Sequence, residues 1–293
     1  MLYRDFATQE EIDRQYDVGT YHPAAPSLSA AKITRSREAR ATLTCKLDVA
    51  YGPRPRQKLD VFPAAEPGAP VLVFIHGGYW KSTTSTKETH SWVALGCQPR
   101  GITTVVVEYD LCPGVTIDTI VAQVRDAVAW VRRHIADYGG DPRRIHVAGS
   151  SAGGHLTAMV AATDWEEHGL PPDTLSGATG ISGLYDLAPF EFSFLQPVLH
   201  LDAGRIARNS PLGLARPGLC PLLLLWGGDE TSEFERQARA MQAAWSGAGN
   251  AAALAAIPGR DHYSISGGLL DPDDSAFGQV FWPHLNACWA RDS

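Results

Sequence analysis

Long apolar runs are missing from this chain of 293 residues. No stretch approaches the roughly 20 apolar residues that a membrane-spanning helix needs. The first dozen positions contain acidic residues and no apolar signal core. We therefore expect no membrane association and no export, and we predict a cytoplasmic protein.

Cysteine is also scarce. The five cysteines are odd in number, scattered, and without the spacing of metal ligands. Such a pattern favours free thiols in a reducing cytoplasm over a disulfide framework or a structural metal site. They are Cys45, Cys97, Cys112, Cys220 and Cys288.

Positive charge is in deficit, with 25 Lys and Arg against 32 Asp and Glu and a net charge of −7. The basic footprint of a nucleic-acid-binding protein is therefore absent. The sequence also contains no Gly-x-Gly-x-x-Gly loop and no His-rich cluster, so we expect neither a cofactor nor a metal. A small-molecule substrate is the expected partner, and a homodimer is left open.

What the chain does contain is an alternation of strands and helices, with enough apolar residues (44%) for one sizeable domain. Residues 117–135 carry an apolar stripe at helical spacing. The pattern predicts a single α/β domain, with a mostly parallel sheet covered by helices on both faces and an antiparallel pair at its start. Residues 1–40 are expected to wrap this body, and residues 81–90 to form an exposed loop. The expected strands are residues 43–49, 57–62, 71–75, 103–107, 144–148, 175–181, 222–226 and 251–257.

The most informative motif is the Gly-x-Ser-x-Gly sequence of residues 149–153. It lies between a predicted strand and a helix of small residues, which is the context of a nucleophile elbow. The tight turn strains the backbone of Ser151, and the flanking glycines remove Cβ atoms that would clash. Ser151 is therefore predicted to be a nucleophile.

A serine nucleophile needs a base and an acid that orients the base. In α/β-hydrolases they follow in the order Ser, acid, His. Asp229 comes after the apolar strand 222–226 and is predicted to be the acid, with Glu230 and Glu233 as alternatives. A helix-capping role is the competing interpretation of Asp229. His262 follows the last strand and is predicted to be the base.

Donors for the developing oxyanion are expected on the loop His76-Gly77-Gly78-Tyr79-Trp80, which follows the strand 71–75. Backbone N–H groups of Gly78 and Tyr79, with that of Ala152, are predicted to form the oxyanion hole. His76 is interpreted as holding the shape of this loop by hydrogen bonds.

Residues 183–215 interrupt the alternation of strands and helices. They are interpreted either as a small cap over Ser151 or as a long loop anchored by aromatic residues. Trp80, Tyr185 and Phe192 are candidates for an aromatic wall of the substrate pocket, and core packing is the alternative role for each.

With these residues placed, the chain resembles the arylformamidase (kynurenine formamidase) group of α/β-hydrolases from about residue 50 onward. The resemblance lies in the His-Gly-Gly-x-Trp loop and in four further segments. It implies Ser151, Asp229 and His262 as the triad. The sequence departs from the group at Ser150, where His is usual, at Glu108, where Asn is usual, and in a longer loop 81–90 and bulky residues 190–194. The further segments are residues 109–113, 182–187 and 210–211, and Asp229 with residues 233–237.

The resulting hypothesis is a cofactor-free serine hydrolase that cleaves a small ester or aryl amide through an acyl-enzyme. The resemblance implies N-formyl-L-kynurenine as the leading substrate, with L-kynurenine and formate as products. A promiscuous carboxylesterase or amidase for aryl compounds is the alternative. A ligand-binding protein that uses a hydrolase fold is a third hypothesis, disfavoured because the chain keeps candidates for both base and acid.

Overall fold

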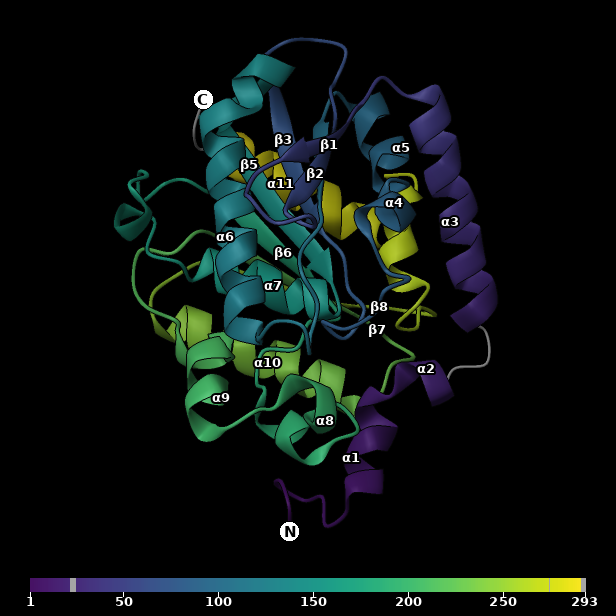
Figure 1. Cartoon of the computed structure of the whole chain (residues 1–293), viewed down its shortest axis with the longest axis vertical. Coiled ribbons are helices and arrows are strands. Elements are labelled where there is room, and N and C mark those ends of the chain that lie inside the picture. Colours follow the sequence, from purple (N-terminus) through teal and green to yellow (C-terminus); the bar gives the residue numbers. More distant parts are fainter. Residues whose placement is uncertain (22–24, 274, 291–293) are drawn as a thin grey trace.

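The structure, a computed structural model, describes residues 1–21, 25–273 and 275–290. Within them, one eight-stranded sheet forms the centre of the molecule, with the strand order β1-β2-β4-β3-β5-β6-β7-β8 (Figure 1). The strands are β1 (Lys46–Ala50), β2 (Lys58–Phe62), β3 (Ala69–Ile75), β4 (Thr103–Val107), β5 (Gly140–Ser150), β6 (Gly177–Ile181), β7 (Leu222–Gly227) and β8 (Ala252–Ile257).

The strand directions confirm the predicted mixed sheet. β1 pairs antiparallel with β2, and β2 pairs antiparallel with β4. Every later pairing, from β4–β3 to β7–β8, is parallel. Because parallel strands bring their carboxyl ends to one edge of the sheet, the loops after β3, β5, β7 and β8 lie together there.

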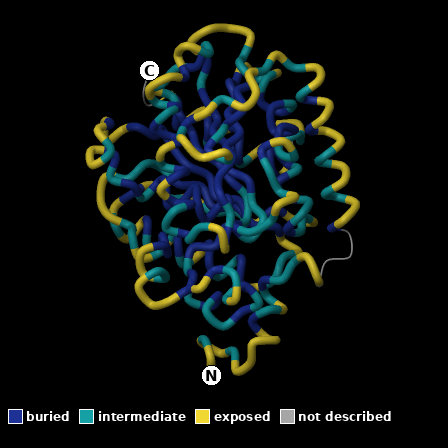
Figure 2. The backbone as a smooth tube through the Cα atoms, viewed as in Figure 1, coloured by how far each residue is buried: buried dark blue, intermediate teal, exposed yellow. Residues whose placement is uncertain are grey.

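Helices cover both faces of the sheet (Figure 1), as the sequence predicts. Successive residues of β3 point to opposite faces. Val71, Val73 and Ile75 pack in one core with α6, α7 and α10, whereas Leu72 and Phe74 pack in a second core with α5 and α11. Figure 2 shows the strands as the buried interior of the molecule. The longer helices on the two faces are α6 (Ile117–His134), α7 (Ala152–Ala161), α10 (Ser232–Gly247) and α11 (Gly278–Ala290), with the short α5 (Val93–Cys97).

Helix α6 illustrates how local signals and packing agree. The side chain of Thr116 caps its N-terminus by accepting from the N–H of Thr119, and three basic residues lie in its last turn. The predicted apolar stripe is buried against the sheet, as in Ile120, Val124 and Val128. The helix therefore matches its predicted range to within one residue.

The N-terminal residues form α1 (Gln9–Tyr16), α2 (Val18–Tyr21) and α3 (Ala25–Thr42). They contact parts of the chain more than 200 residues away. Tyr16 donates a hydrogen bond to Glu233 at 2.5 Å, and Lys32 donates to the carbonyl of Tyr263 at 2.6 Å. Helix α3 lies along the outside of the molecule in Figure 1, with its exposed edge visible in Figure 2.

Residues 183–215 contain short helical segments with a buried aromatic anchor, Phe190. The ring of Phe190 lies 4.7 Å from that of Tyr16, and α9 packs against α6. These segments are η4 (Ala188–Phe192), α8 (Gln196–Leu199), α9 (Ala203–Asn209) and η5 (Pro211–Gly213). The remaining short elements of the chain are α4 (Lys87–His90), η1 (Gln98–Arg100), η2 (Ile135–Tyr138), η3 (Glu166–His168) and η6 (Ile265–Leu270).

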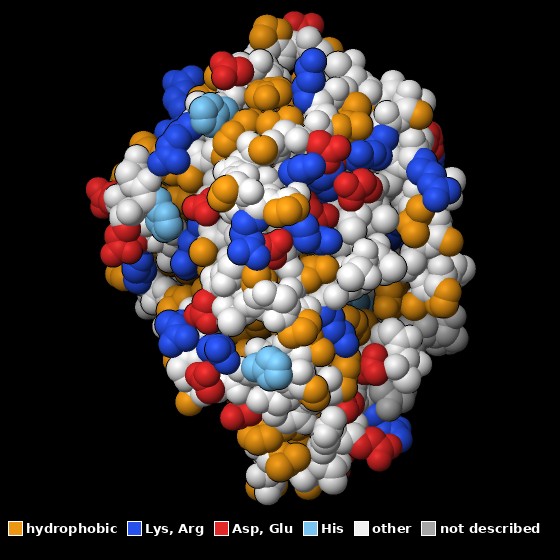
Figure 3. Space-filling view, in the orientation of Figure 1, with side chains coloured by type: hydrophobic (Ala, Val, Ile, Leu, Met, Phe, Trp, Pro, Cys, Tyr) orange, Lys and Arg blue, Asp and Glu red, His pale blue; other side chains and the backbone are white. Residues whose placement is uncertain are grey.

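Among the described residues, no helix is both long enough and apolar enough to span a membrane. On the face drawn in Figure 3, acidic and basic side chains are interspersed, without a large field of either sign.

Candidate active site

The turn between β5 and α7 has the geometry of a nucleophile elbow. Ser151 adopts φ 60° and ψ −122°, a strained conformation for a residue with a Cβ. A Cβ at Gly149 would lie 2.3 Å from the carbonyl oxygen of Gly153, and one at Gly153 would lie 2.0 Å from that of Ile75. Both glycines are therefore required by close backbone packing, and the motif is explained by this turn.

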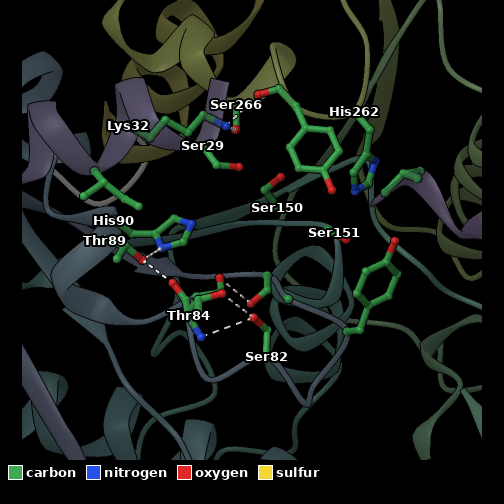
Figure 4. A pocket seen from close by; sticks show the side chains of 17 residues that line it. Ser29, Lys32, Ser82, Thr84, Thr89, His90, Ser150, Ser151, His262 and Ser266 are labelled. Carbon is green, nitrogen blue, oxygen red and sulfur yellow. Dashed lines mark hydrogen bonds between the residues drawn. The ribbon is translucent and has the colours of Figure 1, made fainter. Parts of the chain in front are cut away.

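One cavity of about 270 Å³ brings the predicted residues together. Ser151 and His262 line it with Gly78 and Tyr79, and Figure 4 shows Ser151 and His262 on its wall. Ser151 comes from the end of β5, whereas His262 lies on the loop between β8 and η6. Residues more than 100 positions apart in the sequence thus meet at the carboxyl edge of the sheet.

The acid beside His262 is Glu230, not Asp229. Oε2 of Glu230 lies 3.1 Å from Nδ1 of His262, and the Glu230 side chain is only 1% exposed. Its other oxygen accepts hydrogen bonds from the N–H of Gly227 at 2.8 Å and from the hydroxyl of Ser182. Asp229 is exposed, so the prediction that Asp229 orients His262 is wrong for this geometry.

A turn at the end of β7 explains the correction. The N–H of Glu230 donates to the carbonyl of Gly227 at 3.1 Å, which curls the chain back on itself. The side chain of Glu230 consequently returns beneath the strand end, where it meets the N–H of Gly227. Glu233, the other alternative, is occupied by Tyr16 and Arg236.

The loop after β3 has an unusual backbone. Gly78, Tyr79 and Trp80 have positive φ values of 109°, 54° and 58°, and a Cβ at Gly78 would lie 2.7 Å from that of Ser85. Ala152 is the first residue of α7, whose N–H has no partner within the helix. In the described part of the chain, the backbone N–H groups of Gly78, Tyr79 and Ala152 donate to no protein acceptor. They are thus available to a substrate oxygen.

His76 supports this loop, as interpreted from the sequence. Its Nδ1 lies 2.8 Å from the carbonyl oxygen of Gly77, its Nε2 lies 3.1 Å from Glu108, and its ring stacks on Tyr109 at 4.3 Å. Both ring nitrogens thus lie within hydrogen-bond distance of an oxygen atom. His76 is fully buried and does not line the cavity, so its role is to hold the loop.

Glu108 is the centre of a buried network behind the loop. Besides His76, it accepts from the guanidinium of Arg56 at 2.6 Å and from the backbone N–H of Lys87 at 3.1 Å. Burial raises the pKa of Glu108, but the charges and hydrogen bonds of His76 and Arg56 outweigh it, and the net pKa is lowered. The carboxylate therefore stays ionised.

The three candidates for an aromatic pocket wall lie elsewhere. Trp80 is fully buried and donates to Nδ1 of His155 at 3.1 Å. Tyr185 is also buried, with its hydroxyl against Gly180 and Gly183. Phe192 is partly buried at the edge of the same core. None of the three lines the cavity with Ser151, because the core takes up their rings.

The cavity is roofed by segments that sequence reasoning did not assign to the site. No described residue of 183–215 lines it, so this segment does not form its wall. Ser29, Lys32 and Ile33 of α3 line it instead, and the loop 81–90 contributes Ser82, Thr84, Ser85, Thr89 and His90. The expectation of a merely exposed loop at 81–90 is therefore wrong. The sequence of α3 did not predict its place at the cavity, because the helix is mostly exposed and has no apolar stripe. Its buried residues are only Ala25, Ser36 and Ala39.

One group of potential metal ligands exists among the described residues. His146 of β5 lies beside His284 and Cys288 of α11, with ligand atoms within 4.8 Å of one another. Burial lowers the pKa of His146, and it lowers that of His284 to about 4. None of the three lines the cavity with Ser151, so the group takes no part in that site.

Comparison with known proteins agrees with the fold. A family model described as BD-FAE matches residues 59–177, which include the loop after β3 and Ser151. Kynurenine formamidase of Salmo salar is 29% identical over 280 residues, which cover 90% of this chain and 92% of that protein. Esterase LipQ of Mycobacterium tuberculosis is 32% identical over 239 residues, or 73% of this chain and 56% of that protein.

A solved structure supports the same assignment. The crystal structure of a suspected thioesterase from Silicibacter sp. TM1040 matches with a TM-score of 0.80 and 28% identity, covering 91% of this chain and 97% of that one. Fold and relatives together show an α/β-hydrolase that is similar to kynurenine formamidases over most of its length.

Proposed function

We propose that this serine hydrolase removes a small acyl group, foremost formyl, from an aryl amine. One observation carries the proposal: Glu230 lies within hydrogen-bond distance of His262, and His262 lines the same cavity as Ser151. Relatives named kynurenine formamidase cover 90% of the chain, and they make N-formyl-L-kynurenine the leading substrate.

Ser151 is proposed to attack the carbonyl carbon while His262 takes the hydroxyl proton. Since Nδ1 of His262 faces Glu230, Nε2 is the ring atom left for this transfer. Glu230 fixes the tautomer and stabilises the imidazolium, and the Gly227 and Ser182 donors hold Glu230 in place.

The N–H groups of Gly78, Tyr79 and Ala152 are proposed to stabilise the oxyanion of the tetrahedral intermediate. His262 then protonates the leaving amine, and the C–N bond breaks to give the acyl-enzyme. Water, deprotonated by the same imidazole, attacks the acyl carbon and releases formate and free Ser151. No further co-reactant is required.

The second candidate is a carboxylesterase for short-acyl aryl esters, favoured by the similarity to esterase LipQ. The chemistry of the triad is the same for both, and only the leaving group differs. A cytoplasmic location and a homodimer stay predictions from the sequence.

Two measurements test the proposal. Ser151→Ala should abolish both labelling by a fluorophosphonate and turnover, whereas Ser246→Ala, at an exposed position on α10, should change neither. A Ser151→Ala protein that still labels and turns over would refute the nucleophile. Comparison of kcat/KM for N-formylkynurenine and phenyl acetate then separates the two candidate functions. A strong preference for the ester would rule out the formamidase function.

A further inference from the structure

The walls of the catalytic cavity have an uneven charge. Among the described residues that line it, Lys32 is the only Lys or Arg, and none is Asp or Glu. His90 also lines it, but burial and the nearby His76 lower the pKa of His90 to about 3, so its ring is neutral at physiological pH. The lining therefore contains one side chain that is positively charged at pH 7 and, among the described residues, no carboxylate.

The ammonium of Lys32 is held in place by neutral groups. It donates to the carbonyl oxygen of Tyr263 at 2.6 Å and to the hydroxyl of Ser266 at 2.7 Å. Both partners are uncharged, and in the part of the chain that the structure describes Lys32 forms no ion pair. An ammonium has three N–H donors, so one remains for another acceptor.

Burial of this unbalanced charge is unfavourable. It lowers the pKa of Lys32 to about 8, and the electrostatic field of Asp261 opposes that shift only in part. The side chain is still mainly charged at pH 7. An anion that entered the cavity would supply the missing counter-charge.

Hydroxyl groups lie beside Lys32 on the same side of the cavity. Figure 4 shows Ser29 and Ser150 with their side chains between Lys32 and Ser151. Ser29 is one turn before Lys32 on α3, while Ser150 immediately precedes the nucleophile. A ligand that spans the cavity can thus place one end at Ser151 and the other at Lys32.

We propose that Lys32, assisted by Ser29 and Ser150, forms a carboxylate subsite, and that the enzyme prefers acyl amides or esters whose leaving group carries a carboxylate. The inference rests on the proposed hydrolase function for the position of the scissile bond. Most residues that line the cavity carry a hydroxyl group, so further hydrogen-bond donors are present beside Lys32.

The test is binding of a pair of non-hydrolysable ligands, 4-oxo-4-phenylbutanoate and its uncharged amide, measured by calorimetry at pH 7. The wild-type protein should bind the carboxylate about tenfold or more tightly than the amide, as expected for a charge-assisted hydrogen bond. Lys32→Met should erase this difference and leave binding of the amide unchanged, while Lys32→Arg should restore part of it. Arg37→Met removes an exposed cation from the same helix and should have no effect.

A second test measures steady-state kinetics with two ester substrates, the charged 3-acetoxybenzoate and the uncharged 3-acetoxybenzamide. Lys32→Met should raise the ratio of KM for the benzoate to KM for the benzamide about tenfold. Equal binding of carboxylate and amide by the wild-type protein would overturn the subsite, as would an equal loss for both ligands in Lys32→Met. Absence of turnover with intact carboxylate preference would instead refute the proposed hydrolase function alone.

Discussion

Nδ1 of His262 lies 3.1 Å from the carboxylate of Glu230, while Asp229, one residue earlier, is exposed to solvent. The loop after β7 therefore offers two adjacent carboxylates of which only one is buried. The buried one has three donors: the imidazole, the N–H of Gly227 and the hydroxyl of Ser182. This arrangement makes the contribution of each carboxylate separable by experiment.

Glu230→Gln should lower kcat by about 10³- to 10⁴-fold, because the amide no longer stabilises the imidazolium or selects its tautomer. Asp229→Asn, the matched change on the neighbouring exposed residue, should leave kcat within about threefold, as for a surface position outside the site. Steady-state kinetics on both proteins with phenyl acetate measure the contrast. The reverse ranking would restore Asp229 as the acid.

Gly77→Ala should damage the oxyanion loop. A Cβ there would lie 2.7 Å from the carbonyl oxygen of Ser150 and 3.1 Å from the Cβ of Ser151, so the loop must shift. We expect kcat to fall about 100-fold, comparable to the loss of an oxyanion donor. Gly213→Ala, where nothing lies within 4 Å of the new Cβ, is the control. An active Gly77→Ala enzyme would show that the loop tolerates displacement.

Glu108→Gln should destabilise the protein at neutral pH by about 2 kcal/mol, since a buried ionic network loses one charge. The pKa of Glu108 is lowered below 4.5 in the folded chain. Its contribution to the free energy of unfolding is therefore present above about pH 4.5 and is lost as the pH falls through the lowered value. Urea unfolding at pH 7 and pH 3.5 should show a smaller wild-type advantage at pH 3.5 than at pH 7. Glu38→Gln, which breaks an exposed pair with Arg35, should change little at either pH.

The carboxylate subsite predicts a pH dependence. Because burial lowers the pKa of Lys32 to about 8, KM for 3-acetoxybenzoate should rise as the pH increases through that value, while KM for 3-acetoxybenzamide stays flat. Asp261 and Tyr263 face Lys32 from the loop after β8, but burial raises the pKa of Tyr263 above its ordinary value of 10. His90, from α4, is neutral throughout. A parallel rise for both substrates would assign the effect to the catalytic groups.

Much of the fold was predictable, because parallel strands that are covered by helices on both faces are apolar along their whole length. The strand Leu222–Gly227 (β7) is an example. The elbow was predictable for a different reason, since Gly149 is required by a contact with Gly153 inside the motif itself, although Gly153 is required by a contact with Ile75 of β3. The choice between Asp229 and Glu230 was not, because it depends on one turn hydrogen bond at Gly227. Neither residue type nor order in the chain encodes that bond.

The roof of the cavity was beyond sequence reasoning for a further physical reason. Lys32 and Tyr263 are 231 positions apart, and neither is part of a periodic pattern. Contacts of this kind follow from the packing of α3 against α4 and α5 in the finished fold, and not from local preferences. Aromatic residues such as Trp80 were placed at the pocket wall for a different reason. Large rings occur both in cores and in binding sites, so the residue type alone does not distinguish the two.

The position of Lys32 on α3 has an evolutionary consequence. The segment shared with the BD-FAE family, residues 59–177, contains Ser151 and the glycines of the loop after β3, but not Lys32. This segment thus contains the proposed nucleophile, whereas Glu230, His262 and the proposed carboxylate subsite at Lys32 all lie outside it. A homologue that keeps the elbow but has no cation at the position of Lys32 is therefore expected to carry out the same reaction without the carboxylate preference.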